Sequence, residues 1–237
     1  MKKISFSIIL LLSLTRCDVA QQILNQAGVG LPLSSEEIAS GLKEALNVGA
    51  QNSSNQLSAV DGFFANAAIK ILMPPEAQKV ESTLRSLGLG SVVDKAILSM
   101  NRGAEEAAKS AAPIFINAIK QMTITDAIGI LKGGDFAATN YFKEKTTASL
   151  TEAFRPAIDN ALVKVDATKY WKDVFSVYNK FSAKPVNTDL GAYVTSKAVE
   201  GIFYQVSLEE QKIRKDPVAR VSDILKRVFG SKEAMGN

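Results

Sequence analysis

Residues 135–165 read DFAATNYFKEKTTASLTEAFRPAIDNALVKV, and the apolar spacing within this stretch decides the fold class. Its large apolar residues recur every four positions, at Leu150, Phe154, Ile158 and Leu162. That spacing places them on one face of an α-helix, with polar and charged residues on the remaining faces. The stretch therefore predicts one long helix with a buried face, and Pro156 is expected to kink it.

The same helical period extends in both directions from this stretch. Further helices are expected over Ser35–Leu57, Glu76–Leu87, Ser91–Met122 with a bend at Pro113, Leu190–Val206 and Asp216–Phe229. No stretch alternates apolar and polar residues for long enough to predict a strand. The sequence thus predicts an all-α fold, a single multi-helix bundle of about eight to ten up-and-down helices behind an N-terminal signal peptide.

Polar residues and glycines mark the expected ends of these helices. Thr123 and Asp126 have the spacing of a capping box. Further N-caps are expected at Ser91, Asp135, Thr188 and Asp216. Gly133 and Gly134 resemble a phosphate-binding loop superficially, but they follow a helix and lack the required spacing, so they indicate a helix stop.

Two segments interrupt the helical pattern. Residues 61–75 contain the pair Phe63 and Phe64 and end in two prolines, which predicts an ordered loop packed on the domain. Burial of these two aromatics in the core is favoured over ligand binding. Residues 168–181 are rich in aromatic residues and are also expected in the core, and residues 183–187 are expected to form a linker.

Composition limits the chemistry that the chain can perform. It contains no histidine and a single cysteine, Cys17. Catalytic triads that need histidine, Cys-His pairs and most zinc sites are therefore excluded, and no metal or cofactor is expected. The formal charge is +4, but Lys2, Lys3 and Arg16 precede Cys17, so the chain after residue 16 carries only +1. That balance argues against a nucleic-acid partner.

The first residues have the pattern of an export signal. Two lysines precede an apolar run from Ile4 to Leu14, which is too short to span a bilayer. Residues 1–16 are expected to be removed, leaving Cys17 for lipid attachment, as in bacterial lipoproteins. Arg16 departs from the small residue usual before that cysteine, so a soluble periplasmic product is the alternative.

This interpretation divides the chain into four parts. They are the signal peptide over 1–16, an N-terminal tether over 17–33, the helical domain over 34–230 and a frayed tail over 231–237. The expected location is the cell envelope, facing the periplasm, with the acylated N-terminus in the membrane.

Four blocks of the sequence resemble a bacterial family catalogued as domain of unknown function 4197. They are Asp61–Asn66 with Ile69–Ile71; Ile130–Asp135 with Ala137–Thr139, Tyr141 and Phe142; Thr188–Leu190 with Tyr193 and Val194; and Glu209, Glu210, Ile213, Arg214, Asp216, Pro217, Ala219, Arg220 and Val228–Gly230. The resemblance covers roughly residues 41–230. It implies an exported helical protein and no particular activity.

Two groups of residues are candidates for a ligand site or a structural cluster. One group lies in the loop and comprises Asp61, Phe63, Asn66 and Lys70; the other comprises Glu210, Arg214, Asp216 and Arg220 near the C-terminus. Glu210 and Arg214 have the spacing of a helical ion pair, and Arg220 could fold back on Asp216. A helix corner held by these charges is favoured over an anion site made by the two arginines.

Pairs of neighbouring acids, Glu105 with Glu106 and Glu209 with Glu210, do not converge by themselves because adjacent helical residues point about 100° apart. Because common catalytic residue types are absent and a secretion signal is present, a non-enzymatic envelope module for binding or assembly is the leading functional expectation. The alternatives are a histidine-free enzyme using carboxylate, lysine or tyrosine chemistry, and a carrier of a lipid or other apolar ligand. The partner would be an envelope protein or an apolar ligand.

Overall fold

The computed structural model of the chain describes residues 33–164, 166–169, 171–172, 180 and 189–231. The chain divides into two compact units, Met1–Ser34 and Ser35–Asn237, and the described helices belong to the second. These are α2 (Ser35–Ser58), η1 (Pro75–Ala77), α3 (Gln78–Ser86), α4 (Gly90–Ala108), α5 (Ala111–Gln121), α6 (Ile124–Lys132), α7 (Ala137–Val163), α9 (Leu190–Lys215), η2 (Pro217–Ala219) and α10 (Asp223–Phe229). The described residues form no strand, and the predicted all-α fold is confirmed.

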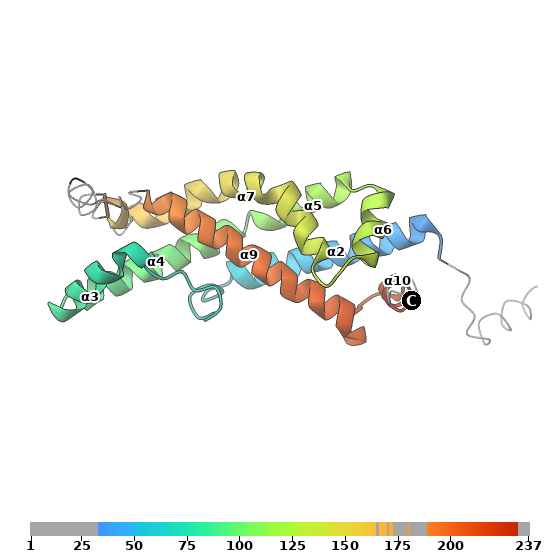
Figure 1. The fold of residues 1–237 in the computed structure, drawn as a ribbon, viewed down its shortest axis with the longest axis horizontal. Helices are drawn as coiled ribbons and strands as arrows, with labels where there is room; N and C mark the ends of the chain where they lie inside the picture. The colour runs from blue at the N-terminus through green and yellow to red at the C-terminus, as the bar shows by residue number, and fades with distance from the viewer. Residues whose placement is uncertain (1–32, 165, 170, 173–179, 181–188, 232–237) are drawn as a thin grey trace, which may run out of the picture. The chain divides into compact units, whose positions relative to one another are not determined.

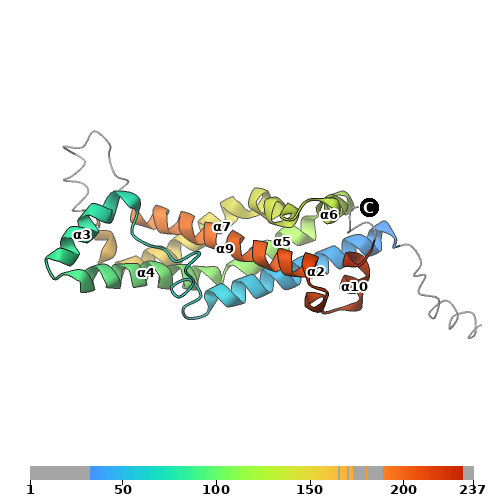
Figure 2. The ribbon, with the colours of Figure 1, turned by 60° about the horizontal axis from the view of Figure 1, so that its bottom comes forward.

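The core forms where α7 packs between α4 and α9. The four apolar residues that repeat along α7 are completely buried, and α9 buries its own four-residue repeat of Leu190, Val194, Ala198, Ile202 and Val206. Figures 1 and 2 both show α7 and α9 lying side by side. The helix α2 packs against α9 and α5 from another side. Burial of these apolar faces drives the fold, as the spacing predicts.

One expected helix is divided in two. The prediction of a single helix over Ser91–Met122 is wrong, because α4 ends at Ala108 and α5 begins at Ala111. Pro113 lies in the first turn of α5, where backbone N–H groups have no partner within the helix, so the proline removes no helical hydrogen bond. The prediction of Ser91 as the N-cap of α4 is wrong, because α4 begins at Gly90 and Leu89 occupies the N-cap position.

Other helix ends differ by a few residues from the expected ones. The expected helix over Asp216–Phe229 is replaced by η2 and α10, and Ser222 caps α10 by accepting the N–H of Leu225. Asp216 does stand before Pro217 as an N-cap, but of the short η2: its carboxylate accepts the N–H of Val218, the second residue of η2, at 2.9 Å. Phe136, rather than Asp135, occupies the N-cap position of α7, and it makes no side-chain bond there.

The capping box of α6 is confirmed, because Thr123 and Asp126 each accept the other's backbone N–H. At α9 the cap is Asp189, whose carboxylate accepts the N–H of Ala192 at 2.9 Å. The expected cap Thr188 lies outside the described residues.

Several sequence expectations fall on parts of the chain that the structure does not describe. They are the signal peptide, Cys17, most of the tether, the linker over 183–187 and nearly all of the tail. Of the aromatic segment over 168–181, Trp171 is described and is buried. Within the described residues, no single helix is both long and apolar enough to cross a bilayer, while residues 90–121 and 124–132, bent by 109°, meet that test only as a pair.

Candidate functional site

The loop between α2 and η1 is fixed by unusual backbone geometry and by a buried aromatic ring. Asp61 has a φ of +68°. A Cβ on the next residue, Gly62, would lie 2.5 Å from the carbonyl oxygen of Gln56, so only glycine fits this turn. Phe63 then enters the core, where a Cβ on Gly201 of α9 would lie 2.5 Å from its ring. The predicted burial in the core is confirmed for Phe63 but not for Phe64, which is only half-buried.

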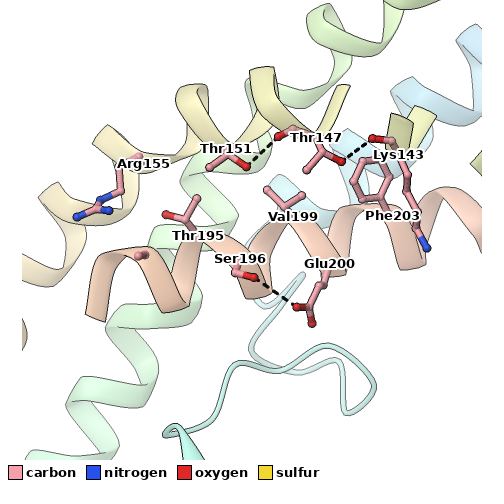
Figure 3. Close-up of a pocket in the computed structure, with 10 residues that line it drawn as sticks. Lys143, Thr147, Thr151, Arg155, Thr195, Ser196, Val199, Glu200 and Phe203 are labelled. Atoms are coloured by element: carbon pink, nitrogen blue, oxygen red, sulfur yellow. Dashed lines mark hydrogen bonds between the residues drawn. The ribbon is translucent and has the colours of Figure 1, made fainter. Parts of the chain in front are cut away.

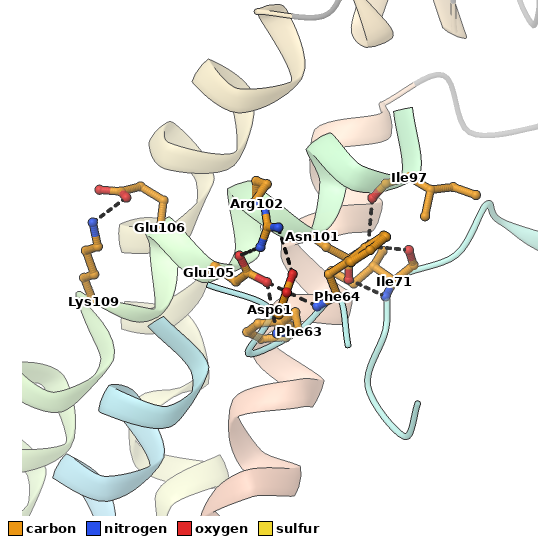
Figure 4. Close-up of polar contacts among 10 residues, drawn as sticks. All are labelled: Asp61, Phe63, Phe64, Ile71, Ile97, Asn101, Arg102, Glu105, Glu106 and Lys109. Atoms are coloured by element: carbon orange, nitrogen blue, oxygen red, sulfur yellow. Dashed lines mark hydrogen bonds and ion pairs between the residues drawn. The ribbon is translucent and has the colours of Figure 1, made fainter. Parts of the chain in front are cut away.

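A buried carboxylate on α4 holds the backbone of this loop. Glu105 accepts the N–H groups of Phe63 and Phe64, each at 3.2 Å, and pairs with Arg102 at 2.5 Å (Figure 4). The same guanidinium reaches Asp61 at 2.8 Å. One turn earlier, Asn101 both accepts the N–H and donates to the carbonyl of Ile71 at 2.9 Å. These side chains therefore satisfy the N–H groups of Phe63, Phe64 and Ile71 and the carbonyl of Ile71.

The two remaining loop candidates make local contacts. Asn66 accepts the N–H of Ala68 at 3.1 Å, and the ammonium of Lys70 lies 3.9 Å from the centre of the half-buried Phe64 ring. Asp61, Phe63, Asn66 and Lys70 thus share one loop, but each has a different contact. This arrangement supports a structural role for the group.

The second group of candidates forms a corner between α6, α7 and α9. Glu210 accepts the N–H of Ala138 at 3.0 Å and both the N–H and the hydroxyl of Thr139 at 2.8 Å. The predicted ion pair with Arg214 is confirmed at 2.9 Å. Arg214 also donates to the carbonyls of Ile130 and Leu131, which end α6. A carboxylate at the first turn of α7 and a guanidinium at the last turn of α6 match the helix dipoles.

Arg220 completes this corner in a different way from the expected one. It donates to the carbonyls of Ile213 and Arg214 at 3.1 and 2.9 Å, so it caps the end of α9 and does not fold back on Asp216. The side chain of Arg214 is only 12% exposed and its donors are engaged. These contacts support the helix-corner interpretation over an anion site.

The neighbouring acids diverge, as adjacent residues on a helix must. Glu209 contacts Lys212 and accepts from Asn52 of α2 at 3.1 Å, while Glu210 faces α7. Likewise Glu106 pairs with Lys109 at 2.5 Å at the surface, while Glu105 faces the loop. Each carboxylate serves a different structural partner.

A groove that sequence reasoning missed runs between α7 and α9. It has a volume of about 550 Å³ and is lined by Lys143, Thr147, Thr151 and Arg155 on α7 and by Ala192, Thr195, Ser196, Val199, Glu200 and Phe203 on α9 (Figure 3). The α7 residues repeat every four positions, so the groove extends over about 18 Å of helix. Val199 and Phe203 are almost completely buried beneath it. The groove therefore combines an apolar floor with a row of hydroxyl groups.

One hydroxyl group in this groove lacks the bond that its neighbours make. Thr147 and Thr151 donate to the carbonyls of Lys143 and Thr147, four residues earlier, at 2.6 and 2.8 Å. Thr195 is 1% exposed, and its hydroxyl oxygen has no hydrogen-bond partner among the described residues. Figure 3 shows its side chain directed from α9 towards α7. Asn47, Thr168 and Gln205 also carry such an atom, but they do not line this groove.

At one end of the groove, the guanidinium of Arg155 is engaged in ion pairs with neighbouring aspartates. Arg155 pairs with Asp159 at 2.6 Å and with Asp189 at 2.8 Å. Burial acts to raise the pKa of Asp189, but hydrogen bonds from Ala192 and Arg155 outweigh it and hold the pKa below its ordinary value. A Cβ on Gly191 would lie 2.1 Å from Asp159, so glycine permits this close approach. At the other end, Lys143 is exposed and pairs with no carboxylate of the described chain.

Comparison with known proteins identifies the family of this chain. A family model described as "Protein of unknown function (DUF4197)" matches residues 32–230, which confirms the resemblance seen in the sequence. No curated protein and no solved structure matches the chain.

Proposed function

We propose that this chain, which belongs to the DUF4197 family, is a non-catalytic binding module tethered to the cell envelope, and that the α7–α9 groove holds its ligand. The observation that carries the proposal is the buried hydroxyl of Thr195. A buried polar group without a hydrogen bond costs about 1–3 kcal/mol. The hydroxyl lies beneath the groove with almost no exposed surface, so a ligand group recovers that free energy where it displaces the side chains that cover the hydroxyl.

The shape of the groove selects the class of ligand. Its length suits an extended molecule, and Phe203, Val199 and the threonine methyl groups provide an apolar surface. Lys143 can receive an anionic group at one end, because its ammonium is not used within the described chain. The ligand is therefore an elongated amphiphile with one acidic end and a hydrogen-bonding group at the level of Thr195.

The charged residues beside the groove support binding rather than acid–base catalysis. Arg155 is engaged by two aspartates. Lys197 is bound to Glu200, and this hydrogen bond raises the pKa of Lys197. A catalytic lysine base needs the opposite shift, towards neutral pH.

The tether part of the proposal rests on the sequence before the described helices. The apolar run and Cys17 support cleavage before the cysteine and acylation of its thiol. Several acyl chains would hold the module stably at a membrane, whereas one chain binds only marginally. Intact-mass analysis of the mature N-terminus tests this: Cys17 with added acyl mass supports it, and an unmodified start after Cys17 contradicts it.

Native mass spectrometry of the chain purified from its own membranes tests the groove. We expect a bound molecule on the wild type and its loss in Ser196→Trp, because an indole on this exposed residue fills the groove. Ser82→Trp is the matched control, since Ser82 is exposed on α3, away from the groove. A wild type that carries no bound molecule, or equal occupancy in both variants, contradicts the proposal.

A further inference from the structure

A second and larger groove lies on another face of α7, against α4. Its volume is about 900 Å³, and its floor contains Ala153, Ala157 and Ala161, which recur every four residues along α7. Ser99 of α4 donates to the carbonyl of Ala161 at 2.7 Å, so the two walls are in direct contact below it. Small side chains on this floor let another helix approach closely.

One wall of this α4–α7 groove carries a regular row of positive charge. Lys95 and Arg102 on α4 and Lys109 at its C-cap are seven residues apart, a repeat of about 10.5 Å along one helix face. Lys164 stands on the opposite wall. All four cations line the same groove.

The acids in the groove neutralise only part of this charge. Arg102 is engaged by Asp61 and Glu105, and Lys109 by Glu106, as Figure 4 shows. Lys95 and Lys164 pair with no carboxylate within the described chain, and both are exposed. The groove therefore keeps a net positive charge at the end where these two lysines lie.

Apolar side chains accompany the cations. Val60 is 79% exposed and Leu98 is 36% exposed, and both line the groove. An occupant must therefore offer acidic and apolar groups together. The concave, helix-long space between two helices accommodates a rod, whereas a flat lipid surface would meet only the rims.

We propose that the α4–α7 groove docks an acidic amphipathic helix of a partner protein with carboxylates spaced seven residues apart. One carboxylate faces Lys95 and Lys164, and the others share Arg102 and Lys109 with the acids that already hold them. This inference is independent of the ligand in the α7–α9 groove, because it rests on different side chains. It gives the module a protein-binding face separate from its ligand site.

The test uses the full mature chain and a synthetic helical peptide of three heptads with one glutamate per heptad on an alanine–leucine face. A control peptide has the same composition with the glutamates placed on different faces. By fluorescence anisotropy, we expect the aligned peptide to bind at least tenfold more tightly than the control, and to weaken as salt rises.

Charge-reversal variants locate the site. Lys95→Glu and Lys164→Glu are each expected to weaken binding of the aligned peptide about tenfold, whereas Lys120→Glu on α5, outside the groove, leaves it unchanged. A peptide with lysine in place of glutamate should bind the double variant Lys95→Glu/Lys164→Glu better than the wild type. Equal affinity for the two glutamate peptides, or an equal effect of Lys120→Glu, overturns the proposal. So does a preference for phosphatidylglycerol vesicles over the peptide that is lost in the same groove variants.

Discussion

Two positions on α9 show opposite uses of a buried polar group. Glu210 accepts three hydrogen bonds from α7 and pairs with Arg214, so its hydrogen-bonding capacity is engaged at the helix corner. Thr195, on the same helix, buries a hydroxyl that bonds to nothing in the described chain. Complete bonding is typical of a residue that holds the fold, whereas the unbonded hydroxyl of Thr195 beside a groove is the basis of the proposed ligand site.

The largest expected effect comes from breaking the fully bonded corner. Glu210→Gln should lower the free energy of unfolding by about 3–5 kcal/mol, because Arg214 is left as a buried charge without its partner. Urea denaturation measures the loss, and Glu144→Gln, an exposed acid on α7, is the control. A loss below about 1 kcal/mol would show that the corner is not held in this way.

Glu105, the buried carboxylate on α4, should contribute less to the free energy of unfolding than Glu210 does. Glu105→Gln is expected to cost about 2–3 kcal/mol, because it weakens the bonds to Phe63 and Phe64, while Arg102 is 37% exposed and can be solvated by water. The same urea titration compares the two variants directly. If Glu105→Gln costs more than Glu210→Gln, exposure of the paired arginine does not set the difference.

The fit of Phe63 gives a third, smaller effect. Gly201→Ala should destabilise the chain by about 1–3 kcal/mol, because the new methyl group overlaps the Phe63 ring. Gly129→Ala is the matched control: it meets no atom within 4 Å inside α6 and should stabilise by about 0.5–1 kcal/mol. Equal shifts of the thermal midpoint in both variants would contradict this packing.

The capping box of α6 also uses a carboxylate to accept a backbone N–H group, but it lies at the solvent-exposed surface. Thr123→Ala should cost about 1 kcal/mol near neutral pH. The Thr123 N–H, and then its hydroxyl, lower the pKa of Asp126. Because the pKa of Asp126 is lower in the folded chain than its ordinary value of about 3.9, the ionised carboxylate stabilises the fold at pH values above about 3.9. This stabilisation is lost as the pH falls through the pKa that Asp126 has in the folded chain. The difference between Thr123→Ala and the wild type should therefore shrink between pH 7 and pH 3 in thermal melts. A constant difference would show that Asp126 does not contribute to it.

Local sequence patterns predicted the helices but not the way they meet. The four-residue spacing located α7 and α9, and the spacing of Glu210 and Arg214 predicted their pair. The break after Ala108 was missed because neither glycine nor proline stands there. Pro113 does not mark the end of α4; it lies in the first turn of α5.

The sites were harder to predict because their partners are distant in sequence. Glu105 bonds to amides more than forty residues earlier, and no local spacing indicates that pairing. The α7–α9 groove exists only because the two helices lie side by side. A signal in the sequence was the spacing of Thr195, which stands four residues before the apolar Val199 and therefore lies on the same face of α9.

Occupancy of the α7–α9 groove in Thr195→Val tests the central claim most directly. Valine keeps the shape of threonine without its hydroxyl, so removing this buried, unbonded group should raise the free energy of unfolding of the ligand-free chain by about 1–3 kcal/mol. We predict that native mass spectrometry finds the bound molecule on wild-type chain from its own membranes, and at least fivefold lower occupancy on the variant. Equal occupancy on the two proteins would contradict the claim that the Thr195 hydroxyl binds a ligand.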